Sequence, residues 1–223
     1  MRKLYHHWLC PYSRKIRLCL HEKKLDFSLV FEPLWDMRPE FLKLNPENKT
    51  PVLIDLNGTV IASNYALTEY LEETYPEAPL FPESLAGKAE ARRLLAWFDD
   101  KMACDVTLPL VLEKTIKRYM DGSRGPDSGA LRSAKQAIHH HMDYMAWLID
   151  RRRWLAGETF TIVDLTAAAH LSSLDYLGDV PWDKHEIVRD WYACLKSRPS
   201  FRSILSDRLP GIAPTNHYAE LDF

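Results

Sequence analysis

Residues 50–62 read TPVLIDLNGTVIA, with two apolar runs on either side of Asn57-Gly58. Asn and Gly tolerate the positive φ angles that a tight two-residue hairpin turn requires. The runs PVLIDL and TVIA therefore predict two antiparallel strands. Upstream of this hairpin, KLYHH at 3–7 can form a strand, and FSLVF at 27–31 has the β-branched and aromatic composition of one.

Three segments around these strands have the apolar spacing of helices, namely 13–24, 38–46 and 64–75. The first of them joins two strands, which predicts a parallel pair with a right-handed crossover. The hairpin adds antiparallel strands to this pair. Residues 1–78 are therefore predicted to form a small α/β domain with a mixed sheet.

The composition changes in EAPLFPESLAGK, residues 77–88, where two prolines and a glycine indicate a linker over 79–88. No later segment has the pattern of a strand, so 89–205 is predicted to be an all-helical domain. The expected helices are 89–119 with a kink at Pro109, 130–152, 161–177 and 187–197, with a loop at 122–129 and a last turn at 201–205.

Two features of the second half are more specific. In GETFTIVDLTAAAHL, residues 157–171, Thr161 and Asp164 have the spacing of a capping box, and the small residues that follow suit a helix buried on all sides. The tail at 206–223 contains prolines that prevent a helix but has five apolar side chains. Such a tail either packs on the body of the protein or docks on a partner.

Composition excludes several function classes. The chain has 223 residues and a formal net charge of −2, which argues against a nucleic-acid-binding protein. No stretch approaches the ~20 apolar residues of a membrane span. The four cysteines form no CxxC pair, and three consecutive histidines at 139–141 diverge around a helix, so no metal site is predicted. We expect a cytoplasmic protein with reduced thiols, in which Cys19, Cys104 and Cys194 belong to the core.

Cys10 is the candidate nucleophile. In WLCPYSRKIR, residues 8–17, it precedes a helix, and Arg14 follows one turn later. A helix N-terminus and a nearby cation both stabilise a thiolate. The alternative is a small buried side chain in a strand-to-helix turn.

LYHHWLCPYSRKIR, NKTPVLID and GETFTIVDLTAAA, taken together over residues 1–205, resemble the cytosolic glutathione transferases. The resemblance implies a thioredoxin-like domain, an all-helical domain and a homodimer. It also implies a cis-proline at Pro51. CPYS is similar to the CPYC of glutaredoxins, with Ser13 replacing the second cysteine, so a mixed disulfide of Cys10 with glutathione would be the intermediate of a thiol transferase.

The same resemblance assigns a glutathione site to Ser13, Thr50, Pro51, Ser63 and Asn64. In the family, the backbone before the cis-proline pairs with the cysteinyl part of glutathione. An acidic or amide residue followed by serine holds the γ-glutamyl carboxylate, whereas this chain has Ser63 followed by Asn64. Because this pocket is altered, the site is expected to be vestigial and the protein to use no cofactor, with glutathione as the ligand if binding is retained.

LDYLGDVPW at 174–182, SRPSF at 197–201 and HYAELDF at 217–223 resemble one branch of these proteins, which binds FtsZ filaments in cell division. The resemblance implies a non-catalytic adaptor at the division site, and the alternative is a glutathione-dependent transferase or thiol transferase that uses Cys10. The candidate partner-binding residues are His217, Tyr218, Leu221 and Phe223. If they form a docking peptide, deletion of 215–223 should leave the fold largely intact; if they form a strap on the helical domain, it should not.

Two basic runs can likewise be interpreted either as structural or as partner-binding. RRR at 151–153 and KTIKRYM at 114–120 lie near predicted helix ends, where cations are favourable. Either run is also suited to contact an acidic filament.

Overall fold

The hairpin forms as predicted in the computed structural model, which describes residues 1–120 and 125–221. β3 (Val52–Ile54) and β4 (Val60–Ala62) are antiparallel, and β3 also pairs antiparallel with β1 (Arg2–His6). β1 pairs in parallel with β2 (Phe27–Phe31), so the sheet order is β2-β1-β3-β4. The mixed sheet expected from the sequence is therefore confirmed.

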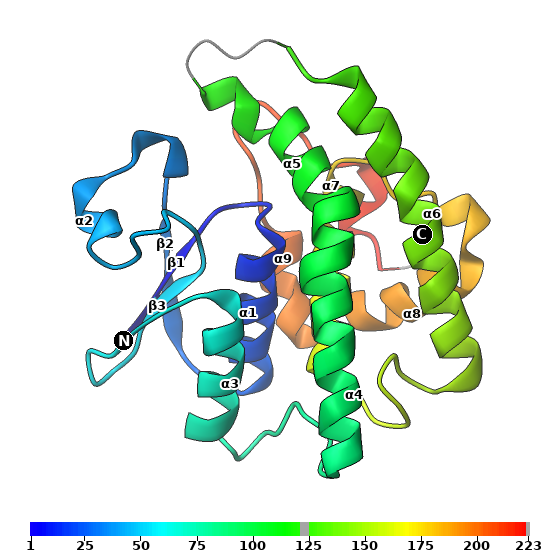
Figure 1. The fold of residues 1–223 in the computed structure, drawn as a ribbon, viewed down its shortest axis with the longest axis horizontal. Helices are drawn as coiled ribbons and strands as arrows, with labels where there is room; N and C mark the ends of the chain where they lie inside the picture. Colours follow the sequence, from blue (N-terminus) through cyan, green and yellow to red (C-terminus); the bar gives the residue numbers. More distant parts are fainter. Residues whose placement is uncertain (121–124, 222–223) are drawn as a thin grey trace.

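Helices cover this sheet on the side that faces the rest of the molecule (Figure 1). α1 (Pro11–Glu22) is the crossover between β1 and β2, and it packs against α3 (Asn64–Thr74). The short segments η1 (Leu34–Asp36) and α2 (Pro39–Leu42) lie between β2 and β3. Leu4, Leu53 and Ile61 occupy equivalent positions on adjacent strands and are buried in the core.

The remainder of the described chain contains helices and no further strand, as predicted. Its segments are α4 (Leu85–Ala96), η2 (Trp97–Thr107), α5 (Leu108–Lys114), η3 (Ile116–Tyr119), α6 (Ser128–Arg151), α7 (Ile162–Tyr176), η4 (Trp182–Lys184), α8 (Glu186–Lys196), η5 (Pro199–Phe201), α9 (Arg202–Leu205) and η6 (Asn216–Ala219). No helix in the described ranges is both long enough and apolar enough to span a membrane.

In two places a helix begins inside a predicted linker or loop. α4 begins at Leu85, inside the predicted linker, because Ser84 accepts a hydrogen bond from the Gly87 amide and caps the helix. α6 begins at Ser128 because Asp127 caps it, so part of the predicted 122–129 loop is helical. Residues 121–124 lie outside the described residues.

The long predicted helix at 89–119 continues through Pro109 by changing its hydrogen-bond pattern. η2 is a π-helical segment, and at its end the Leu108 amide donates to the carbonyl of Ala103, five residues earlier. Proline has no amide hydrogen to continue an α-helical ladder, and α5 starts at the residue before it. After α5 the chain makes the separate 3-10 turn η3.

α7 is the central helix of the second half. Thr161 and Asp164 form the predicted capping box, in which the Thr161 amide donates to Asp164 Oδ2 at 2.9 Å. Every residue of α7 is buried, also as predicted. The helix contacts α1, η2, α4, α5 and α8, so it joins the α/β part to the helical part.

The tail at 206–221 packs along the body of the protein as a strap. The hydroxyl of Tyr218, which is 0% exposed, donates to the Ile204 carbonyl at 3.0 Å. The His217 ring lies 2.9 Å from Asp175, and Lys196 donates to the His217 carbonyl at 3.1 Å. Tyr218 is therefore inside the fold and cannot contact a partner while the strap is docked. Leu221 is 46% exposed, and Phe223 lies outside the described residues.

The expectation for the other cysteines was partly wrong. Cys19 is buried on α1, but Cys104 and Cys194 are exposed. Each of these two residues falls on the outer side of a helix whose opposite face carries core residues, as the buried Met102 and Tyr192, each two positions earlier, illustrate. The residue type alone does not indicate whether a cysteine faces the core or the solvent.

Candidate functional site

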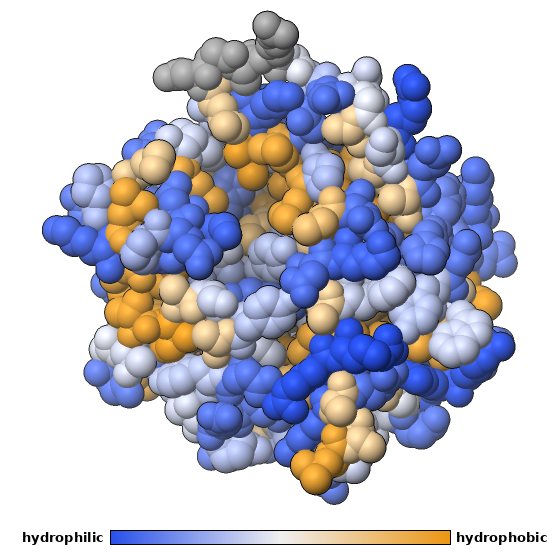
Figure 2. Space-filling model, viewed as in Figure 1, coloured by the Kyte–Doolittle hydropathy of each residue, from blue (hydrophilic) through white to orange (hydrophobic). Residues whose placement is uncertain are grey.

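The candidate site is a cleft between the α/β part and the helical part. Figure 2 shows the hollow, with hydrophobic residues gathered on its α5 side. Two adjoining cavities make up the cleft. One, of about 290 Å³, contains Cys10 and Leu108, and the other, of about 330 Å³, contains Asn64 and Asp100. Tyr12, Lys49 and Thr50 line both cavities.

Cys10 is the N-cap of α1 at the edge of the first cavity. Its Sγ accepts a hydrogen bond from the Ser13 amide at 3.4 Å and lies 3.6 Å from the Thr50 carbonyl, to which the thiol donates. The side chain is half-buried. Cys10 therefore lies at the N-terminus of α1, where the sequence placed it.

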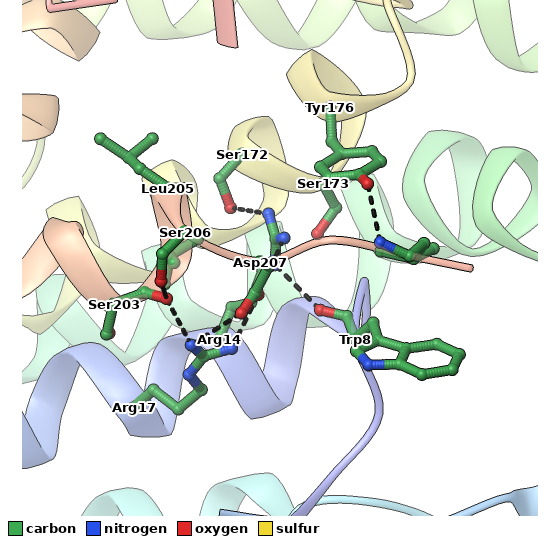
Figure 3. A network of polar contacts seen from close by, with 12 residues as sticks. Trp8, Arg14, Arg17, Ser172, Ser173, Tyr176, Ser203, Leu205, Ser206 and Asp207 are labelled. Carbon is green, nitrogen blue, oxygen red and sulfur yellow. Dashed lines mark hydrogen bonds and ion pairs between the residues drawn. The ribbon is translucent and has the colours of Figure 1, made fainter. Parts of the chain in front are cut away.

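Arg14 does not support the thiolate, contrary to expectation. Its side chain is 0% exposed and points away from Cys10, toward α7 and the strap (Figure 3). Nε donates to the Trp8 carbonyl at 3.1 Å, and one terminal nitrogen donates to Ser172 Oγ at 2.9 Å. Arg14, one turn after Cys10, faces α7, so its charge interacts with buried groups of the fold.

Asp207 of the strap pairs with this arginine and with Arg17, and we call the three residues the arginine clamp. Arg14 reaches Asp207 Oδ2 at 3.2 Å, while Arg17, 1% exposed, binds both carboxylate oxygens at 2.8 and 2.9 Å. Figure 3 shows both arginines rising from α1 toward the strap. The clamp fixes α1, and with it the helix start that holds Cys10, against the helical part.

The second cavity contains most of the residues assigned to the glutathione site. The Thr50-Pro51 peptide bond is cis, as the resemblance implied. Ser63 adopts a positive φ of 84° just before α3. The Asn64 side chain is nine-tenths buried, and neither its amide oxygen nor its nitrogen has a hydrogen-bond partner among the described residues. Asn64 also lines this cavity.

Ser13 is the exception among the assigned residues. It is fully buried in α1, and its side chain lines neither cavity. Only its backbone amide takes part in the site, through the hydrogen bond to Cys10. Its position on the inner face of α1 explains the difference.

A buried ionic cluster supports the wall of the second cavity, and no sequence pattern indicated it. Asp99 of η2 accepts a hydrogen bond from Lys15 at 2.7 Å and lies 3.4 Å from His170 of α7. Burial raises the pKa of Asp99, but Lys15 and His170 outweigh it, so the pKa falls to about 2. The carboxylate is therefore charged at neutral pH. Because Lys15, Asp99 and His170 are far apart in the sequence, no local pattern predicts that they meet.

Tyr12 connects this cluster to both cavities. Its hydroxyl donates to the Asp99 carbonyl at 2.9 Å, and burial raises its pKa well above the usual value. Tyr65, which also lines the second cavity, donates a short hydrogen bond to Asp100. Both hydroxyls remain protonated and act as donors at neutral pH.

Two histidines of the run at 139–141 have different partners. His141 lies 3.1 Å from Asp105, whereas His139 lies 2.9 Å from His185 at the start of α8. Within residues 1–120 and 125–221, no group of three or more His, Cys, Asp or Glu side chains is placed to hold a metal ion. The residues that line the cleft include Cys10, Tyr12 and Asn64, together with charged residues such as Lys49 and Asp100.

The comparisons with known proteins agree with this fold and cleft. Residues 9–74 match the family of the glutathione S-transferase N-terminal domain. The chain is 46% identical to FtsZ-localized protein A of Caulobacter vibrioides, across 100% of this chain and 98% of that protein. A glutathione S-transferase structure from Rhodospirillum rubrum F11 matches with 50% identity and a TM-score of 0.96, covering 100% of both chains. The structure of FzlA from C. crescentus matches with 46% identity and a TM-score of 0.95, covering 100% of this chain and 99% of that one.

The thioredoxin-like domain, the helical domain and the cis-proline cleft define a glutathione transferase fold, and the chain belongs to the glutathione S-transferase family. Within the family it is similar along its whole length, strap included, to FtsZ-localized protein A. Both parts of the resemblance seen in the sequence motifs are confirmed.

Proposed function

We propose that this protein is an adaptor of cell division that binds FtsZ filaments. The observation that carries this proposal is the 46% identity to FtsZ-localized protein A, which extends over 100% of the chain. By contrast, glutathione S-transferase 2 of Saccharomyces cerevisiae is 28% identical over 89% of the chain. FtsZ-localized protein A therefore has the higher sequence identity of the two, and its match covers the whole of this chain.

We further propose that the adaptor acts as a homodimer at the division site. A dimer presents each filament-binding surface twice. On a polymer, the second contact then benefits from the effective concentration created by the first. This arrangement gives a simple mechanism for bundling or bending filaments.

Co-sedimentation tests the proposal. The full chain is mixed with FtsZ from the same organism, assembled with GTP, and the filaments are pelleted. We expect the protein in the pellet with filaments and in the supernatant with GDP-bound, unassembled FtsZ. Recovery in the supernatant under both conditions, at micromolar concentrations, would contradict the proposed function.

A specific observation favours a second candidate, a glutathione-dependent thiol transferase. Cys10 caps α1 at the mouth of a cleft that also contains cis-Pro51 and the unpartnered amide of Asn64. In such a reaction the Cys10 thiolate would attack the glutathionyl sulfur of a glutathione mixed disulfide, form a disulfide between Cys10 and glutathione, and release the other half of the substrate as a thiolate. A second glutathione thiolate would then attack the glutathionyl sulfur, form oxidised glutathione and release the Cys10 thiolate.

Glutathione titration and a Cys10→Ala variant separate the two candidates. If the cleft is vestigial, calorimetry should detect no binding at millimolar glutathione, and the wild type and Cys10→Ala should co-sediment equally with FtsZ. Measurable disulfide reduction that depends on glutathione and disappears in Cys10→Ala would instead support the enzyme.

A further inference from the structure

The strap forms one wall of an open groove that is separate from the cleft. The groove has a volume of about 470 Å³, and we call it the strap groove. It is bounded by the end of α5 and η3, the start of α6, the end of α7 and the strap. Its lining residues are Lys114, Arg118, Pro126, Leu131, Tyr176, Leu177, Ile212, Ala213, Pro214 and Thr215.

Hydrogen bonds to Tyr176 hold the groove in shape. Its hydroxyl donates to the Ile212 carbonyl at 2.7 Å and accepts from the Leu209 amide at 2.9 Å. Its backbone carbonyl accepts from the Thr215 amide at 3.3 Å. The strap wall is therefore preformed, and a ligand would not have to order it.

The floor of the groove is apolar, whereas its rim is cationic. Leu131, Leu177 and Ile212 are only partly buried against the core. On the rim, Lys114 lies 2.6 Å from the buried carboxylate of Asp179. Lys135, which does not itself line the groove, lies 3.2 Å from the same carboxylate. Two lysines beside the groove thus share one negative charge, which leaves one positive charge in excess.

Arg118 adds a second, exposed cation to this rim. Two acidic residues near Arg118 in the described chain, Glu113 and Asp127, are already used within the fold, while Asp121 lies outside the described residues. Glu113 pairs with Lys117 at 2.7 Å and accepts from the Asp127 amide, while Asp127 caps α6. The chain as a whole has a formal charge of −2, so this rim is a local departure from its overall charge.

We infer that the strap groove docks an acidic, extended segment of the filament protein, with an apolar side chain of that segment on the floor. The inference rests on the proposed function, because it names the surface that contacts the filament. Charge complementarity at a rim increases the association rate, and the apolar floor supplies the buried contact. The KTIKRYM run contributes Lys114 and Arg118 to this surface.

Charge reversal tests the surface. Arg118→Glu changes an exposed rim residue, and Ala213→Glu places a carboxylate inside the groove at another exposed position. Arg153→Glu is the matched control, because it makes the same charge change beyond the opposite end of α6, a 24-residue helix about 36 Å long. Circular dichroism melts verify that each variant is folded.

We expect both groove variants to bind assembled FtsZ about tenfold more weakly than wild type in co-sedimentation, whereas Arg153→Glu binds normally. Wild-type binding should also weaken as salt rises. If wild type binds and the folded groove variants bind equally well, the groove assignment is overturned while the proposed function stands. If Arg153→Glu alone loses binding, the RRR run is the contact. Failure of wild type to bind overturns the proposed function itself.

Discussion

At the scale of single residues, the main feature is the number of buried charges on α1. Arg14, Lys15 and Arg17 are consecutive or nearly so, and all three are buried with carboxylates from the helical part. A buried cation costs several kcal/mol unless it is paired and hydrogen-bonded. The sequence motif SRKIR therefore encodes contacts between domains, although it has the composition of a solvated helix face.

The arginine clamp gives the first prediction. Asp207→Asn preserves the shape of the side chain but removes the charge that balances Arg14 and Arg17. Because two guanidinium groups then stay buried without a carboxylate, we expect the free energy of unfolding to fall by about 3 kcal/mol. Urea denaturation measures this, with the exposed strap residue Glu220→Gln as control. Equal losses in the two variants would contradict the role of the clamp.

His7 gives a prediction about pH. The residue is buried among the rings of Trp8, Phe31 and Trp35, and burial lowers its pKa from 6.5 to about 4. A folded-state pKa below the unfolded one means that the folded protein binds fewer protons in this window. The stability contribution is therefore complete above pH 6.5 and is lost as pH falls toward 4.

We expect this histidine to account for about 1–2 kcal/mol of lost stability between pH 7 and pH 5. In His7→Phe the decline measured by urea denaturation should be smaller by that amount. His6, whose pKa is also lowered to about 4 by burial, retains its own share. The exposed His140→Gln serves as control and should leave the slope unchanged. An unaltered slope in His7→Phe would rule this origin out.

At the scale of elements, the tail is a strap that is packed on the body of the protein. Tyr218 is fully buried against α7 and α9, whereas Leu221 is exposed. Tyr218→Ala should lower the free energy of unfolding by about 3 kcal/mol, as removal of a buried aromatic side chain does. Leu221→Ser should change it by less than about 0.5 kcal/mol. Thermal and urea denaturation measure both values.

The same pair of variants separates stability from partner binding. Because Tyr218 is buried, deletion of 215–223 should destabilise the protein, contrary to the docking-peptide reading of the tail. Leu221→Ser leaves the strap docked, so any loss of FtsZ co-sedimentation in this variant would come from the exposed tip. If Tyr218→Ala proves as stable as wild type, the strap does not pack as described.

At the scale of the whole molecule, the two parts share one interior. α1 and α7 are in contact along their lengths, and Lys15, Arg14 and Arg17 reach across this contact to Asp99 and Asp207. Neither part can be separated without exposing apolar surface and leaving buried charges unpaired. The domain boundary near residue 78 is therefore a boundary in topology, and we do not expect it to be a boundary in stability.

A truncated chain of residues 1–84 tests this conclusion. It contains the whole sheet, α1 and α3, but lacks every carboxylate that pairs with the α1 cations across the interface. We expect it to be unfolded or aggregated by circular dichroism, whereas the full chain should unfold in one cooperative transition. A soluble fragment with a cooperative melt would show that the α/β part is stable alone.

The sequence by itself determined the local structure and the order of elements. Hydrophobic periodicity, the Asn57-Gly58 turn and the Thr161-Asp164 cap depend on residues close together in the chain, and each was found where expected. Recognised motifs also located Cys10 and Pro51 at the cleft. The π-helical segment η2, which ends two residues before Pro109, was not predicted, because composition does not reveal a change in the backbone hydrogen-bond pattern.

Only the tertiary structure decided where the charges point and which surfaces remain open. Arg14 faces Asp207 and not Cys10, Tyr218 is buried, and Asp99 meets Lys15 and His170. These pairs join residues 71 to 193 positions apart. Periodicity reports which face of a helix is apolar, but it does not report which distant segment will cover that face. The partner of a buried charge is therefore fixed by packing in three dimensions.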